Sequence, residues 1–240
     1  QVTSIGNYSI AFCSSLESFI IPENATNIGV YAFAFDSNLK TINIPKNMAY
    51  IPANMFYQCS ELASLVVPET VTSIGERAFG YCLKLSSINI PQKITIIESN
   101  LFNNCMNMES IQIPNNVVTI KMNAFYKCIK LASIKIPEKV SIIGEGAFYQ
   151  CIKLTTIQIP DSVTTISGSL LYNCDELESI EFNDHITTIG KDSFYNCTKL
   201  MNIKLPNSLT TINQNSFYHC ISLKEITFPI KLETIGTTCF

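Results

Sequence analysis

The sequence predicts an α/β solenoid of about ten 23-residue units, each with a short parallel strand and a helical turn. Two observations carry this prediction: the even spacing of proline and cysteine, and an isoleucine that returns every 23 residues. Repetition at this period is typical of stacked repeat architectures rather than of one globular core. The chain is therefore expected to form a single continuous array over residues 1–240, with both ends cut inside a repeat.

Three residue types share one spacing. Nine of the ten prolines fall on a common 23-residue lattice, and so do nine of the ten cysteines, with Asp36 in the one gap. A unit of this size cannot surround its own apolar residues, so each unit must stack on its neighbours and share their core. The isoleucine column has no gap and consists of Ile5, Ile28, Ile51, Ile74, Ile97, Ile120, Ile143, Ile166, Ile189, Ile212 and Ile235.

Each unit is predicted to contain a strand, a possible second strand and a helical turn. Residues 133–136, Ser-Ile-Lys-Ile, alternate polar and apolar, which indicates a strand. The proline that follows ends it, because proline lacks the N–H that a further ladder bond requires. Residues 163–166 are β-branched at all four positions and could form a second, weaker strand. Ala124, Phe125 and Cys128 have the spacing that brings side chains to one face of a helical turn.

Glycine follows the lattice isoleucine in six units, which at first suggests a backbone with positive φ. Pro52 stands in the same column, and proline fixes φ near −65°. We therefore expect these glycines to serve close packing between coils.

Composition excludes several classes of function. Hydrophobic residues make up 47% and charged residues 15% of the chain, so it is expected to fold rather than to remain disordered. The net charge is −3, with no basic block, so nucleic acid is not an expected partner. No apolar run reaches the ~18 residues of a membrane span, so no direct membrane insertion is expected in this segment.

The cysteines and histidines do not point to chemistry. Equivalent cysteines in neighbouring coils point in parallel, whereas a disulfide needs converging Cβ atoms, so free buried thiols are expected. Cys239 occupies the alanine column and is expected in the core. His185 and His219 stand in columns that are otherwise mostly polar, which predicts exposed positions. Phosphate loops, dinucleotide fingerprints and zinc spacings are absent from the sequence, so no catalytic residue, cofactor site or metal site is predicted.

The unit, written LxxIxIPxxVxxIxxxAFxxCxx, resembles the BspA-type, or treponemal-type, leucine-rich repeat over the whole chain. Local departures are Asn183 for the proline, Leu171 for the phenylalanine and Asp36 for the cysteine. The resemblance implies a curved leucine-rich-repeat solenoid with a parallel β-sheet along the concave face and short helical turns on the opposite side. It also implies a role in cell adhesion and protein–protein interaction at the surface of bacteria or parasitic protists. It implies a protein or glycan partner, such as the host extracellular matrix.

Outward strand positions are the candidate ligand face. One outward column is almost entirely hydroxyl, whereas the next varies in size and charge on a constant scaffold, as a recognition surface would. The alternative is an unconstrained solvated face. The variable column consists of Ile20, Asn43, Val66, Asn89, Gln112, Lys135, Gln158, Glu181 and Lys204.

A tyrosine stripe is a candidate protein contact, because tyrosine combines apolar area with a hydroxyl. Stacking between coils is the alternative explanation. The stripe consists of Tyr126, Tyr149, Tyr172, Tyr195 and Tyr218, with Tyr57 isolated from it.

The location of the protein stays open on the residues alone. Asn7, Asn24 and Asn196 begin glycosylation sequons, which suit a secreted or cell-surface protein. Unpaired thiols favour a reducing compartment instead, which would make the chain a cytoplasmic scaffold that docks a protein partner. The family resemblance favours the cell surface.

Overall fold

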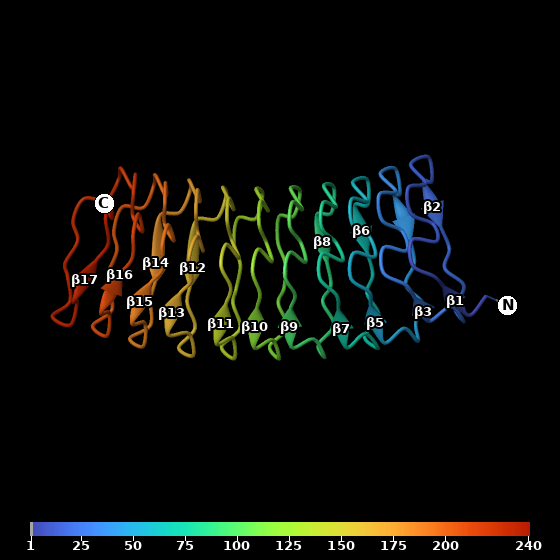
Figure 1. Ribbon diagram of the computed structural model, residues 1–240, viewed down its shortest axis with the longest axis horizontal. Coiled ribbons are helices and arrows are strands. Elements are labelled where there is room, and N and C mark those ends of the chain that lie inside the picture. Colours follow the sequence, from blue (N-terminus) through green and yellow to red (C-terminus); the bar gives the residue numbers. More distant parts are fainter. Residues whose placement is uncertain (1) are drawn as a thin grey trace.

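The computed structural model describes residues 2–240 and shows one row of stacked coils with the two termini at its ends (Figure 1). Every strand pairing is parallel and joins residues 23 positions apart, for example Ile97 with Ile120 and Ile120 with Ile143. Each coil is therefore one sequence repeat, and the predicted solenoid is confirmed.

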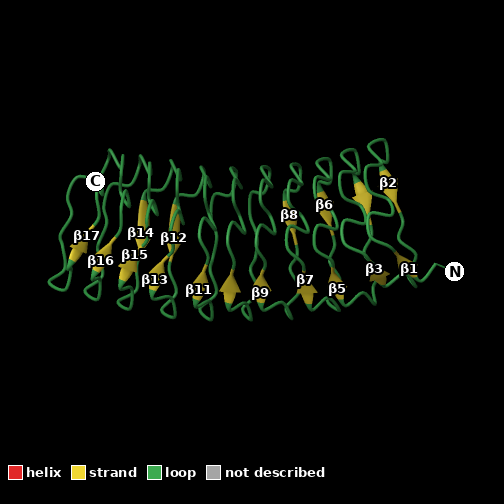
Figure 2. Cartoon of the chain, in the orientation of Figure 1, coloured by secondary structure: helices red, strands yellow, loops and turns green. Residues whose placement is uncertain are grey.

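Short strands run along two sides of the solenoid (Figure 2). We call the row that precedes the proline column ladder A, and the row that carries the lattice isoleucine ladder B. Ladder A consists of β2 (Ser18–Phe19), β4 (Thr41–Ile42), β6 (Ser64–Leu65), β8 (Ser87–Ile88), β12 (Thr156–Gln158) and β14 (Ser179–Glu181), with an isolated bridge between Asn202 and Glu225. Ladder B consists of β1 (Ser4–Ile5), β3 (Asn27–Ile28), β5 (Tyr50–Ile51), β7 (Ser73–Ile74), β9 (Ile96–Ile97), β10 (Thr119–Ile120), β11 (Ile142–Ile143), β13 (Thr165–Ile166), β15 (Thr188–Ile189), β16 (Thr211–Ile212) and β17 (Thr234–Ile235).

The two ladders differ from the expectation in how regularly their strands form. The segment predicted as the weaker strand forms ladder B, which has a strand in every coil from β1 to β17. Ladder A has no assigned strand at residues 110–113 or 133–136. The β-branched threonine and isoleucine residues that recur in ladder B favour extended backbone, which explains its regularity.

The predicted helical turns are absent from residues 2–240, where the third side of each coil is a chain of turns. Two residues per coil adopt positive φ there, such as Asn123 at 55° and Lys127 at 58°. Backbone N–H groups on this side donate to the following coil: Phe125 N–H bonds to the Ala147 carbonyl at 2.9 Å and Lys127 N–H to the Tyr149 carbonyl at 2.7 Å. These bonds to the next coil replace the bonds within the segment that a helix would need. The predicted inward face is nevertheless correct, because Ala124, Phe125 and Cys128 are all buried.

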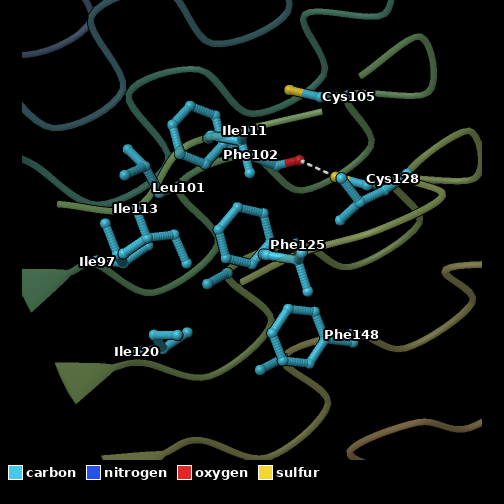
Figure 3. Close-up of a cluster of buried hydrophobic side chains, with 14 of the residues drawn as sticks. Ile97, Leu101, Phe102, Cys105, Ile111, Ile113, Ile120, Phe125, Cys128 and Phe148 are labelled. Atoms are coloured by element: carbon cyan, nitrogen blue, oxygen red, sulfur yellow. Dashed lines mark hydrogen bonds between the residues drawn. The ribbon is translucent and has the colours of Figure 1, made fainter. Parts of the chain in front are cut away.

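The core is built from the repeating columns. The phenylalanine rings form a stack through the middle of the solenoid, with Phe102 and Phe125 centroids 5.6 Å apart and Phe125 and Phe148 centroids 5.5 Å apart (Figure 3). Asn183, which replaces proline, is buried and donates from its amide nitrogen to the carbonyls of Pro160 and Val163, at 2.6 and 3.0 Å. The buried amide that replaces proline therefore has its hydrogen-bond partners in the preceding coil.

All ten cysteines are free thiols, as predicted. Eight of them, from Cys59 to Cys220, donate from Sγ to the carbonyl of the residue 26 positions earlier, as Cys128 does to Phe102 at 3.3 Å (Figure 3). Burial raises the pKa of these thiols, which keeps them protonated. Cys239 is buried as predicted, whereas Cys13 is exposed because it lies in the first coil of the stack.

The glycine column serves close packing, as expected. Gly144 has no positive φ, and a Cβ placed on it would lie 2.4 Å from the backbone nitrogen of Met122 in the preceding coil. A Cβ on Gly75 would likewise lie 2.4 Å from the backbone nitrogen of Ala53. The one glycine with positive φ, Gly146, belongs instead to the column of Asn123 on the turn side.

Candidate functional site

Most of the predicted ligand face points to solvent from ladder A. Gln112, Lys135, Gln158, Glu181 and Lys204 are all exposed. Ile20 and Val66 are also exposed, with 83% and 77% of their surfaces accessible. The alternation of buried and exposed residues along these segments thus gives the predicted orientation, and the column lies along one face of the solenoid.

Two asparagines of this column have a structural role. The Asn43 side chain accepts from the backbone N–H of Ile21 at 2.7 Å and donates to the Ile21 carbonyl at 3.0 Å. Asn89 forms the same pair of bonds with Val67, at 3.0 and 2.7 Å. Because both ends of each amide are engaged with the preceding coil, these two residues extend the pairing of ladder A.

The hydroxyl column beside it is exposed along its whole length from Ser18 to Ser179. Within residues 2–240, no hydrogen bond joins these hydroxyls to one another. They therefore present both donors and acceptors on the same face as Lys135 and its neighbours.

Shallow hollows lie along ladder A. Lys135 stands between two of them, with volumes of about 240 and 390 Å³. Lys204 lines a third hollow of about 600 Å³, together with Glu225 and Phe228. The predicted face therefore has relief into which parts of a ligand could fit.

The tyrosine stripe is a stack of rings between coils. Tyr149 and Tyr172 lie 4.6 Å apart, and Tyr172 and Tyr195 lie 4.5 Å apart, with the planes of each pair within 3° of parallel. Desolvation, followed by the neighbouring tyrosine, raises the pKa of Tyr149 and of Tyr172. Tyr126 to Tyr195 are half-buried and Tyr218 is exposed, so the stripe offers ring edges rather than ring faces to a partner.

The sequons differ in accessibility. Asn7 and Asn24 are exposed. Asn196 is half-buried, its amide nitrogen donates to Asp175 at 3.3 Å, and its amide oxygen lies 2.6 Å from Nδ1 of His219. A glycan would be attached to that amide nitrogen, so at Asn196 the nitrogen that would carry the glycan is already engaged in a hydrogen bond.

Both histidines are exposed, as their columns predict. In the part of the chain that the structure describes, no group of three or more His, Cys, Asp or Glu residues is arranged to hold a metal ion. Residues 2–240 also include no helix with the length and apolar character needed to cross a membrane.

An exposed apolar patch on ladder B was missed by the sequence reasoning. Ile96, Val118, Met122 and Ile142 lie on or beside β9, β10 and β11 and are 36 to 57% exposed. The columns of Ile96, Val118 and Ile142 otherwise carry mostly threonine or serine, so an interruption of these hydroxyl columns was the available signal. The patch marks the middle coils as different from the rest of the array.

Comparison with known proteins gives the same architecture. The chain is similar to a leucine-rich repeat protein of Bacteroides ovatus, with 25% identity, a TM-score of 0.61, and coverage of 100% of this chain and 80% of that one. It is also similar to a leucine rich cell surface protein of Faecalibacterium prausnitzii, with 28% identity, a TM-score of 0.66, and coverage of 96% and 72%. A leucine-rich repeat protein of T. pallidum shares the fold at 24% identity and a TM-score of 0.63, with 81% of each chain covered.

No curated protein matches the chain. The model of the BspA type leucine rich repeat region matches residues 3–132, 50–174 and 118–240, with six copies. These matches together span nearly all of the described residues, in agreement with the 23-residue period and the parallel pairing. The chain therefore belongs to the BspA-type leucine-rich repeat family.

Proposed function

We propose that this chain is a non-enzymatic adhesion or recognition module that binds a protein or glycan through the exposed face of ladder A. The observation that carries the proposal is the contrast between a constant core and the variable exposed column that includes Lys135, Glu181 and Lys204. A cell-surface or secreted location is supported by the likeness to the cell surface protein of F. prausnitzii and by the exposed sequons at Asn7 and Asn24.

Charge reversal on the face tests this proposal. The purified chain is applied to an array of glycans and matrix proteins, and the variant Lys135→Glu/Glu181→Lys/Lys204→Glu is compared with it. We expect the variant to lose most binding to the ligand found, because these exposed charges contribute to steering and specificity.

The control makes the same change in charge elsewhere. Lys93→Glu/Lys231→Glu/Glu233→Lys alters exposed residues outside the ladder A column and should leave binding unchanged. Undiminished binding by the ladder A variant would refute the assignment of this face.

The tyrosine stripe is proposed as a contact between two copies or with a partner protein. Mass by light scattering is compared for the chain and for Tyr149→Ser/Tyr172→Ser/Tyr195→Ser. We expect a dimer mass for the parent and a monomer mass for the variant, because serine removes both the apolar edges and the hydroxyl groups. The triple change to phenylalanine keeps the stacked rings and serves as the folding control. A monomer mass in both parent and serine variant would exclude the contact.

A second candidate function is an intracellular scaffold that docks one protein partner. The free thiols and the apolar patch at Val118, Met122 and Ile142 favour it, because exposed apolar area is typical of protein interfaces. Mass spectrometry of material from the native source separates the two candidates. Glycans at Asn7 or Asn24 would exclude the cytosolic location.

A further inference from the structure

One stretch in the middle of the array has a net positive charge, whereas the segments on both sides of it have a net negative charge. Residues 1–115 contain five basic and eight acidic side chains, residues 116–158 contain six and two, and residues 159–240 contain five and nine. The single coil from residue 120 to residue 142 has five lysines and one glutamate. The middle of the solenoid is therefore a positive band between two acidic segments.

Lys135 is the member of this band that stands in the variable column of ladder A. Lys121 is paired with Glu98 at 2.7 Å, and Lys139 donates to the Asn116 side chain at 3.3 Å. Over residues 2–240, Lys135 has no ion-pair partner within 4.0 Å. Its ammonium group is exposed and thus available to an external anion.

The surroundings of Lys135 are rich in hydroxyls and amides. One adjacent hollow is lined by Ser110, Gln112 and Ser133, and the other by Ser133, Thr156 and Gln158. Glu138, at the turn, is the one acidic side chain among the described residues that line them. The walls therefore combine a single cation with donors and acceptors that are spaced from coil to coil by roughly 4.8 Å.

This chemistry fits an acidic sugar chain better than a peptide. Protein interfaces are typically anchored by aromatic or arginine side chains in their centre, and the residues lining the two hollows include neither. Sugar hydroxyls pair well with serine, threonine and glutamine side chains, and a carboxylate or sulfate group would pair with the ammonium group. The charge complementarity selects the acidic glycan over a neutral one.

We propose that the face of ladder A around Lys135 binds an acidic glycan, with its carboxylate or sulfate group on Lys135 and its hydroxyls on the flanking serine, threonine and glutamine side chains. This inference rests on the proposed function and names its ligand class. Glu181 limits the site on one side, because it lies in the same column two coils beyond Lys135, roughly 10 Å away. The binding segment of the glycan is accordingly short.

The test uses the full chain and three defined probes: heparan sulfate, hyaluronan and neutral dextran. We expect binding to the two acidic chains and not to dextran, with affinity that falls as salt is raised. Lys135→Gln should weaken binding roughly tenfold, which is the order expected for loss of one charge-assisted hydrogen bond. Heparan sulfate carries sulfate and carboxylate groups, whereas hyaluronan carries carboxylates only. Binding to heparan sulfate alone would therefore identify sulfate as the recognised group, and binding to both chains would show that a carboxylate suffices.

Lys130→Gln is the matched control, because Lys130 is exposed in the same lysine-rich coil but lines neither hollow, so this change should alter affinity little. The acidic-glycan proposal is overturned if Lys135→Gln and Lys130→Gln have equal effects. It is also overturned if single-stranded DNA or poly-glutamate binds as tightly as the acidic glycans, since charge alone then accounts for the interaction.

Failure of this inference is distinguishable from failure of the proposed function. If no acidic glycan binds, but the array finds another ligand that the ladder A charge reversal abolishes, the recognition face stands and the ligand class is wrong. If no ligand depends on ladder A, both proposals fail. Lys135 is exposed, so circular dichroism should show an unchanged fold in every Lys135 variant.

Discussion

Replacement of Phe125 by alanine is expected to lower the free energy of unfolding by about 3–5 kcal/mol, the usual range for removing a buried phenyl ring. Phe125 is fully buried, and its ring stacks against Phe102 on one side and Phe148 on the other, with interplanar angles of 16° and 4°. The substitution opens a cavity and removes both ring contacts. Because coils contact only their neighbours, we expect the loss to weaken the coupling between the two halves of the array.

Urea unfolding measures the loss, and hydrogen exchange locates it. Amides of the coils next to Phe125 should exchange faster than those of distant coils. Phe125→Leu is the matched variant, since Leu171 occupies the same column with full burial, and it should cost clearly less than alanine. Phe12→Ala, at a ring that is 65% exposed, should have the smallest effect. Equal losses for Phe125→Ala and Phe12→Ala would show that the central stack contributes little to stability.

The inward residues could be predicted from the sequence because the repeat itself defines the core. A column that is apolar in every unit can be satisfied only by facing the same column in the next coil. The phenylalanine, cysteine and isoleucine columns are accordingly buried nearly throughout, and the thiols are free, as parallel stacking requires. These conclusions needed only the period and the residue type.

The helical turns were a wrong prediction because local spacing is ambiguous. The separation of three positions between Phe125 and Cys128 is compatible with a helix. It is equally compatible with turns in which residues such as Asn123 adopt positive φ. The choice between them depends on hydrogen bonds to the next coil, 22 residues away, which no local pattern reports. A signal was nevertheless present: Asn54, Asn100, Asn123, Gly146 and Asn215 share one column, and asparagine and glycine are the residues most tolerant of that backbone region.

The candidate face was predictable in position but not in detail. Alternation of inward and outward residues places Glu181 outward on β14 and Lys135 outward in the equivalent extended segment of its coil. The engagement of Asn43 and Asn89 by backbone groups of the preceding coil depends on side-chain rotamers, which the sequence does not specify. Ile20 and Val66 remain exposed on the same face because the backbone alternation, and not their hydrophobicity, decides where they point.

Replacement of Asp36 by asparagine is expected to stabilise the first coils at neutral pH by about 2–3 kcal/mol. Asp36 takes the place of a cysteine and is fully buried. Its Oδ1 accepts from the backbone N–H of Cys13 at 2.7 Å, while Oδ2 has no hydrogen-bond partner. Desolvation is the main cause that raises the pKa of this carboxyl from 3.8 to about 6, and the bond from Cys13 opposes it. Each pKa unit corresponds to about 1.4 kcal/mol, and the lower figure allows for water near the exposed Cys13.

The pH dependence distinguishes this effect from a general change in packing. Between about pH 3.8 and pH 6 the folded chain holds a proton on Asp36 that the unfolded chain has lost, so stability falls as pH rises through this window. Below the window both states are protonated and no penalty remains, whereas above it the whole penalty applies. Asparagine keeps the acceptor for Cys13 and cannot ionise, so the variant should gain most above pH 6 and little near pH 4.

Urea unfolding of the chain and of Asp36→Asn at several pH values from 4 to 8 measures this difference, with hydrogen exchange to show that it arises in the coils around Asp36. Asp184→Asn, at an exposed carboxylate, controls for the change in net charge and should give a difference that does not depend on burial. A gain for Asp36→Asn that is the same at pH 4 and pH 8 would mean that folding leaves the pKa of Asp36 unchanged. The argument from desolvation would then be wrong, and the column would accommodate a charged aspartate without a penalty.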